Sequence, residues 1–286
     1  MLLSTICFVL VTALVKSLGS NLPAAQAAFI RYIIGTIILF PFIIPILSKA
    51  FNKKNIIIYS FRGLTQGFGV ILWFYAMARI PIAEVTAISY TGPIYISIGA
   101  VIFFGEKLAL RRVSAIIIAF IGTLIILRPG FQEISTGQIA QVISAPLFAI
   151  SYLLSKELTK SQSSITIVCM LSVFLTLFLA PFAFSVWVQP TSIQILTLGI
   201  IALIATLGHI CLTQAIKLAP LTVIQPVSFL QLVWATSIGY FIFSETGDSF
   251  VLIGGSIIIL SVTYISYREM KLNIQNQTPH VSSTKS

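Results

Sequence analysis

Long apolar runs, separated by short polar segments, divide this chain into stretches of roughly twenty residues. A transmembrane helix needs about 20 predominantly apolar residues to cross the hydrocarbon layer. The polar segments carry charges, and most also contain proline or glycine, as connections between antiparallel spans do. The pattern therefore predicts helices at residues 1–18, 24–47, 56–78, 82–104, 111–128, 137–155, 163–183, 193–216, 221–243 and 249–267.

The composition supports an all-α integral membrane protein. Hydrophobic residues make up 57% of the chain and charged residues 8%, and the mean hydropathy is +1.03. Soluble domains use about 25% charged residues. No stretch is long and polar enough for a separate soluble domain, and residues 271–286 are predicted to form a disordered tail. The net charge is +10, but in a membrane protein the basic residues of the loops mainly fix orientation, so we expect the lipid bilayer as a partner and no nucleic acid.

The basic residues predict the orientation of the chain in the membrane. Of the 17 lysines and arginines, twelve fall in alternate connections and the tail, and only three, Lys16, Arg79 and Arg128, fall in the opposite connections. Cytoplasmic loops carry the excess of lysine and arginine in membrane proteins. Both termini are therefore predicted to face the cytoplasm. The remaining two, Arg31 and Arg62, fall within predicted spans.

The two halves of the chain resemble each other at a constant separation of 139 positions. The separation pairs Ala76 with Ala215, Pro81 with Pro220, Ser89 with Ser228, Tyr90 with Phe229, Tyr95 with Trp234, Phe104 with Phe243, and Glu106 with Glu245. We interpret this as two homologous repeats, at residues 1–130 and 131–270.

Five helices per repeat is an odd number, so the second repeat must enter the membrane from the opposite side. The charges agree, because Glu106 is followed by Lys107, Arg111 and Arg112, whereas no basic residue stands at the matching positions after Glu245. The predicted fold is thus ten transmembrane helices in two inverted five-helix repeats. This construction is found in many secondary transporters, which bind substrate near the midplane between the repeats.

The segment FRGLTQGFGVILWFYAMARIPIAEVTAISYTGPIYISIGAVIFFGEKLALRRVSAIIIAFIGTLIILRPG, with its weaker copy ending in GYFIFSE, resembles the EamA-type members of the drug/metabolite transporter superfamily. AFIRYIIGTI, around Arg31, resembles the second helix of that family. The resemblance covers nearly the whole chain. It implies ten helices, inverted repeats, cytoplasmic termini and secondary transport of a small metabolite across the bacterial inner membrane.

Polar and aromatic side chains inside the spans are the candidates for a substrate site. Arg31 lies roughly 10 Å into its helix, and an arginine near the bilayer centre costs about 2.5–3.5 kcal/mol, so it should face the bundle or a wet cavity. It either binds a substrate anion or ties helix ends by bonding carbonyls. The candidate substrate-binding residues are Arg31, Gln66, Trp73, Thr91, Tyr95, Gln214, Gln231 and Trp234.

For the aromatic candidates, packing and interface anchoring are the competing interpretations. Arg62 and Lys16 lie nearer the ends of their spans and are predicted to extend toward the interface. Gly63 and Gly67 have the four-residue spacing of close helix packing. Glu106 and Glu245, at span ends, either anchor the interface by pairing with lysine or capping the next helix, or take part in proton coupling.

Enzymatic signals are nearly absent from the sequence. His209 and His280 are the only histidines, Cys7, Cys169 and Cys211 stand singly, and no metal-ligand spacing or G-x-x-x-x-G-K-[ST] motif occurs. We therefore expect no cofactor, no metal and no catalytic residue. The predicted function is alternating-access transport of a small polar metabolite, an amino acid or derivative such as S-adenosylmethionine. A lipid-intermediate flippase or membrane-embedded enzyme is the alternative.

Overall fold

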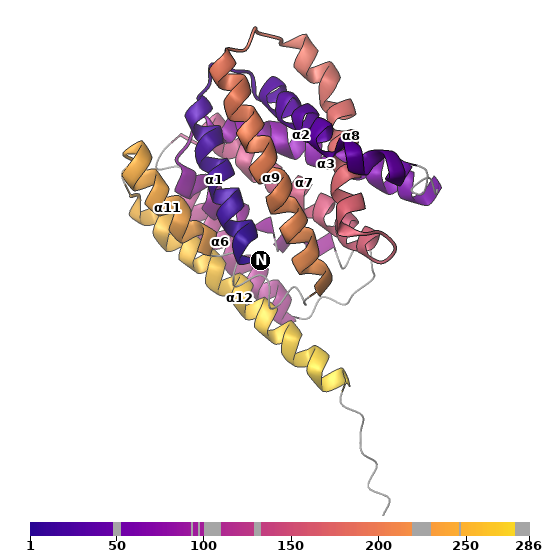
Figure 1. The fold of residues 1–286 in the computed structure, drawn as a ribbon. Helices are drawn as coiled ribbons and strands as arrows, with labels where there is room; N and C mark the ends of the chain where they lie inside the picture. The colour runs from indigo at the N-terminus through magenta and orange to yellow at the C-terminus, as the bar shows by residue number, and fades with distance from the viewer. Residues whose placement is uncertain are drawn as a thin grey trace, which may run out of the picture.

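The computed structural model describes residues 1–47, 53–92, 94–96, 98–99, 110–128, 133–218, 230–245 and 247–277. This described part is helical and contains no strand (Figure 1). Its helices are α1 (Leu2–Leu18), α2 (Ala24–Leu47), α3 (Lys53–Met77), α4 (Ile82–Ser89), α6 (Leu110–Leu127), α7 (Thr136–Thr159), α8 (Ser164–Ser185), α9 (Ser192–Leu218), α11 (Leu230–Phe243) and α12 (Ser249–Gln277).

Each predicted span corresponds to one of these helices, and most boundaries agree within a few residues. Within the spans predicted at 82–104 and 221–243, residues 93, 97, 100–104 and 221–229 lie outside the described residues, and so does Glu106 in the connection that follows. Five helices, α2, α3, α7, α8 and α9, are long and apolar enough to cross a membrane. Shorter apolar stretches lie in α1, α6, α11 and α12. The prediction of an all-helical membrane protein is confirmed.

Helix α12 extends farther than the sequence pattern predicted. It continues to Gln277, past residue 270 where we placed the end of the second repeat. The extension has a local cause, because the segment Arg268–Gln277 contains no glycine or proline and is rich in helix formers. In Figure 1 this end of α12 projects beyond the bundle.

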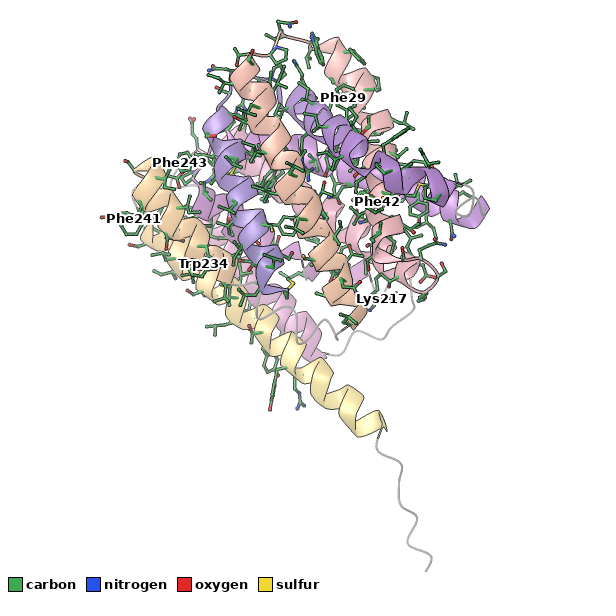
Figure 2. All side chains as sticks on the ribbon, viewed as in Figure 1. Phe29, Phe42, Lys217, Trp234, Phe241 and Phe243 are labelled. Carbon is green, nitrogen blue, oxygen red and sulfur yellow. The ribbon has the colours of Figure 1, made fainter. Side chains whose placement is uncertain are left out.

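The outer surface of the bundle is strongly apolar. Phe241 on α11 is 80% exposed and lies at the outer edge of the molecule, while Phe42 on α2 is exposed on another side (Figure 2). Many other leucines, isoleucines and phenylalanines of α2, α8, α9 and α12 are also exposed. Soluble proteins rarely expose apolar patches of more than a few hundred Å². Lipid is the environment that such a surface requires.

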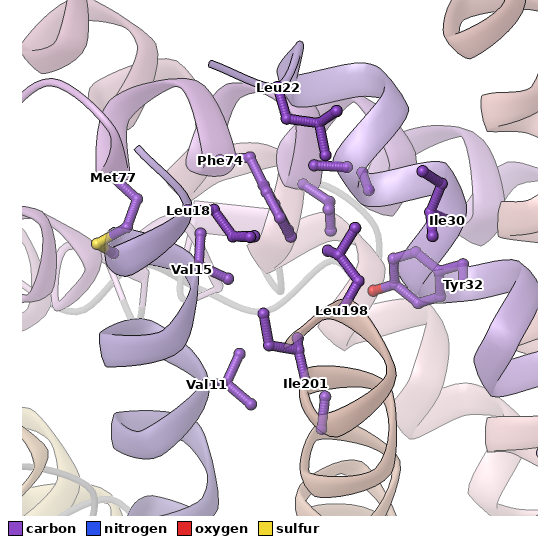
Figure 3. Close-up of a cluster of buried hydrophobic side chains, with 14 of the residues drawn as sticks. Val11, Val15, Leu18, Leu22, Ile30, Tyr32, Phe74, Met77, Leu198 and Ile201 are labelled. Carbon is purple, nitrogen blue, oxygen red and sulfur yellow. The ribbon is translucent and has the colours of Figure 1, made fainter. Parts of the chain in front are cut away.

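The main core lies where the helices of the two halves meet. Helix α1 runs beside α9, and α3 packs against α7. Figure 3 shows the α1 side chains directed toward α9 and α3, with α2 closing the far side. The residues drawn there come from the largest cluster of buried side chains, which includes Val11, Val15, Leu18, Ile30, Phe74, Met77, Leu198 and Ile201.

Small residues allow the closest helix contacts. A Cβ atom added to Gly63 on α3 would lie only 2.8 Å from the Cβ of Phe174 on α8, and one on Gly67 would overlap the ring of Phe178. The predicted packing role of this glycine pair is therefore confirmed. Gly122 of α6 and Gly254 of α12 make a second close approach. A Cβ atom added to either glycine would collide with the carbonyl oxygen of the other. Close backbone approach of this kind drives helix association in lipid.

Candidate functional site

A cavity of about 290 Å³ lies inside the bundle. Its lining comes from α1, α2, α3 and α4 of the first half and from α7, α9 and α11 of the second. The volume is just below the range of about 300–1,000 Å³ found for small-molecule sites. The cavity is therefore large enough for a small metabolite and is lined by residues of both halves of the chain.

Two buried arginines give the cavity its charge. Arg31 on α2 is 7% exposed, and its guanidinium carbon lies 4.0 Å from the centre of the Tyr32 ring. Arg62 on α3 is 6% exposed, and its Nη1 donates a hydrogen bond to the carbonyl oxygen of Ile167 on α8 at 3.3 Å. Arg62 therefore does not extend to the interface as predicted. Helix α3 begins at Lys53, earlier than the predicted residue 56, which places Arg62 deeper in the bundle.

The remaining polar groups of the lining are uncharged amides, hydroxyls and one imidazole. Gln66 on α3 and Gln231 on α11 supply amides, and His209 on α9 meets the Phe8 ring edge-on at 5.1 Å. The hydroxyls of Thr12, Thr86, Ser89 and Thr213 each donate to a carbonyl oxygen four residues earlier in their own helix. Among the residues that the structure describes, neither aspartate nor glutamate lines this cavity.

Aromatic rings form much of the apolar wall. Trp73 and Phe74 on α3 contact each other edge-on, with ring centres 5.4 Å apart, and both line the cavity. Phe148 and Tyr152 on α7 line it as well. Such rings pack against flat apolar groups, and their faces attract cations. The site thus combines positive charge, neutral hydrogen-bonding groups and aromatic surface.

The structure brings together four of the eight candidate residues: Arg31, Gln66, Trp73 and Gln231 all line the cavity. The other four do not appear in its lining. Thr91 is buried and donates to the carbonyl oxygen of Ile88, and Tyr95 is partly buried. Gln214 is exposed and accepts from Ser164, and Trp234 is 45% exposed (Figure 2). A role in substrate binding stays a prediction for all eight.

The direction of Trp234 follows from the way α11 packs. This helix buries Leu232, Ala235 and Gly239 against the bundle. Successive helical positions are rotated by about 100°, so Trp234 points away from the face that Ala235 buries. The sequence pairs Trp234 with Tyr95 only by their constant separation, whereas the neighbours of α11 decide which way the Trp234 side chain points.

Sequence reasoning did not select Arg62, His209, Ser151 or Tyr152, which also line the cavity. His209 and Tyr152 carried a signal, because each is a polar side chain inside an apolar span. Arg62 is also a polar side chain inside an apolar span, but the predicted start of that span at residue 56 put it too near the helix end. No group of three or more metal-ligating side chains gathers anywhere in the described ranges.

Comparison with known proteins identifies relatives over nearly the whole chain. The model of the EamA-like transporter family matches residues 1–128 and again residues 135–267. The S-adenosylmethionine uptake transporter of Rickettsia bellii is 28% identical, over 90% of this chain and 88% of the relative. The pseudopaline exporter CntI of Pseudomonas aeruginosa is 24% identical, over 92% and 93%. The riboflavin transporter of Vibrio cholerae is 26% identical, over 95% and 93%.

The fold also has a match among solved structures. One crystal structure, 15% identical in sequence, superposes with a TM-score of 0.63 over 93% of this chain and 95% of that chain. At this level of identity the match concerns the fold alone.

Proposed function

Because the chain belongs to the EamA-like transporter family, whose members are transporters and not enzymes, we propose that it is a secondary active transporter working by alternating access. The cargo we propose is a small polar metabolite, an amino acid or amino-acid derivative. S-adenosylmethionine, which the Rickettsia relatives take up, is the specific candidate. The proposed location is the bacterial inner membrane.

The observation that carries this proposal is the cavity between the two halves. Secondary transporters built from two repeats bind substrate near the bilayer midplane at the repeat interface, and one repeat then moves against the other. Here the lining comes from α1, α2, α3 and α4 on one side and α7, α9 and α11 on the other. A relative movement of the halves would change access to every polar group of the cavity at once.

We propose two inverted repeats at residues 1–130 and 131–270, and the helix packing supports a twofold relation between them. Helix α3 packs on α7 and α9 packs on α1, and likewise α8 packs on α3 and α2 packs on α9. Suppose that the halves are exchanged, so that α1, α2 and α3 take the places of α7, α8 and α9. The contact of α3 with α7 then becomes the contact of α9 with α1, and the contact of α3 with α8 becomes the contact of α9 with α2. The hydroxyls of Thr36 on α2 and Thr176 on α8 lie 3.0 Å apart, as equivalent groups near a twofold axis would.

The proposed orientation, with both termini in the cytoplasm, is tested by reporter fusions. We expect fusions after Lys54, Lys160 and Lys271 to report the cytoplasm and fusions near Gln189 and Asp248 to report the opposite side. A cytoplasmic Asp248 would contradict the inverted arrangement, because Glu106 and Glu245 would then lie on the same side of the membrane.

Uptake into proteoliposomes tests transport itself. The purified protein should accumulate members of a labelled panel of amino acids and derivatives, including S-adenosylmethionine, and an imposed pH gradient should raise the accumulation if protons are coupled. Protein-free liposomes supply the background. If no panel member enters faster than into protein-free liposomes, in either gradient direction, the proposed function is wrong.

A further inference from the structure

We propose that Arg31 and Arg62 together hold a carboxylate of the transported metabolite, while the aromatic wall that includes Trp73 and Tyr152 receives its remaining part. This inference rests on the proposed function and assigns a chemical class to the ligand of the cavity. It predicts that a carboxylate is required for binding and that the matching neutral amide is rejected.

The first support is the unpaired positive charge of the cavity. In membrane interiors, charged side chains pair with one another, with backbone carbonyls or with water, because each isolated charge is costly. Neither Arg31 nor Arg62 forms an ion pair with a described residue, and the described lining contains no acidic residue. Two positive charges facing one cavity thus lack the protein carboxylate that would neutralise them.

The second support is the hydrogen-bonding capacity left over on these guanidinium groups. An arginine side chain has five N–H donors. Arg62 uses Nη1 for the carbonyl of Ile167, but its Nε is buried without a partner among the described residues. Arg31 stacks on Tyr32 and donates to no described residue. A carboxylate can accept several N–H bonds at once, and paired guanidinium groups match its planar shape.

A purely structural role accounts for only part of this arrangement. The bond from Arg62 to Ile167 ties α3 to α8, but that tie uses one donor and leaves the charge without an opposite partner. Arg31, on α2, also lines this cavity, and so does His209 on α9. Convergence of two arginines from different helices on one cavity favours a ligand that carries the missing negative charge.

The rest of the lining limits what else the ligand carries. Trp73, Phe74, Phe148 and Tyr152 offer ring faces, against which a flat group or a small cation binds favourably. A positively charged group on the ligand would find no acidic partner in the described lining, so these ring faces are the part of the site that can receive it. An amino acid or planar carboxylate therefore fits with its anionic group at Arg31 and Arg62 and its remainder among the rings.

Binding of an isosteric pair of probes tests the proposal. Nicotinate and nicotinamide have the same ring and nearly the same size, but only nicotinate carries a carboxylate. Binding to the purified protein in detergent is measured by scintillation proximity with the labelled compounds. We expect nicotinate to bind at millimolar concentration, about ten- to a hundredfold more tightly than nicotinamide, which is the effect of losing one charged hydrogen bond.

Three variants separate recognition from folding. Arg62→Gln should weaken nicotinate binding toward that of nicotinamide and affect nicotinamide binding much less. Arg62→Lys should recover part of the loss because it restores the charge without the planar fork. The control is Arg79→Gln, since Arg79 is exposed, stacks on Tyr75 and is absent from the cavity lining. Gel filtration and helical circular dichroism verify that each variant is folded.

The outcomes distinguish this inference from the proposed function. Equal binding of the two probes, no nicotinate binding at millimolar concentration, or stronger displacement of nicotinate by inorganic phosphate than by unlabelled nicotinate would each overturn the carboxylate assignment. Uptake confined to metabolites that lack a carboxylate would also overturn it, while leaving the transporter proposal intact. If nicotinate binds in an Arg62-dependent manner but no metabolite of the panel is taken up, the carboxylate assignment is supported and the transport proposal is refuted.

Discussion

Replacement of Arg31 by leucine should remove most of the transport activity while leaving the protein folded in the membrane. Arg31 is 7% exposed, lines the cavity and forms no ion pair with a described residue. Leucine is apolar and thus acceptable to the bundle, so loss of the guanidinium group should affect the ligand more than the fold. Loss of one charged hydrogen bond to the substrate predicts a decrease in transport of about ten- to a hundredfold.

Two further variants give this prediction its control. Arg31→Lys should retain part of the activity, because the charge survives while the planar donor geometry is lost. Arg79→Leu makes the same replacement at an exposed arginine outside the cavity and should transport at the wild-type rate. The initial rate of uptake into proteoliposomes, normalised to reconstituted protein, is the measurement. Normal transport by Arg31→Leu would exclude a role for this residue in substrate binding.

Replacement of Glu245 by leucine should destabilise the folded protein. Glu245 follows α11, and its Oε1 lies 2.9 Å from the Nζ of Lys16 on α1, with both side chains less than one-fifth exposed. Its Oε2 accepts a hydrogen bond from the backbone N–H of Ile82 at 3.0 Å, which caps the beginning of α4. Lys16 also donates to the carbonyl oxygen of Ile80 at 2.7 Å. One carboxylate therefore connects three helices.

The expected loss has two components that a graded series of variants separates. Glu245→Leu removes the ion pair and the cap, and should lower the free energy of unfolding by about 2–4 kcal/mol. Glu245→Gln retains an oxygen that can accept from Ile82, and should lower it by about 1–2 kcal/mol. Denaturant titration in mixed micelles, followed by circular dichroism, measures both values.

The matched control is Glu157→Gln. Glu157 pairs with Lys160 three residues later on a much more exposed surface, and exposed pairs contribute only about 0–1 kcal/mol. This variant should lower the free energy of unfolding by no more than about 1 kcal/mol. If Glu245→Leu unfolds at the wild-type midpoint, the connection between α1, α4 and α11 has no stabilising role.

For Glu245 the sequence predicted the kind of interaction that the structure shows, but it did not identify the partners. Its position at the end of an apolar run predicted either pairing with lysine and capping of the next helix, or proton coupling. The structure pairs it with Lys16 and places its carboxylate at the start of α4, which precedes it by more than 160 residues in the sequence. The equivalent Glu106 lies outside the described residues, so its partners stay a prediction.

The sequence by itself determined the number of apolar segments, their approximate ends and the membrane environment. These properties are local, because the thickness of the hydrocarbon layer fixes how many consecutive apolar residues a span needs. They also follow from the requirement that backbone groups in lipid satisfy one another within the helix. The close helix packing at Gly63 and Gly67 could likewise be predicted from the sequence, because only small residues allow a neighbouring helix to approach closely.

Only the tertiary structure decided which side chains face the cavity. Arg31, Gln66, Trp73 and Gln231 line it, whereas Trp234 points outward and Arg62 points inward, against expectation for both. In a soluble helix the apolar stripe marks the buried face. In this chain the lipid-facing and protein-facing sides of a helix are almost equally apolar, so the pattern does not distinguish them. The direction of each side chain is set by the contacts between helices that lie far apart in the sequence.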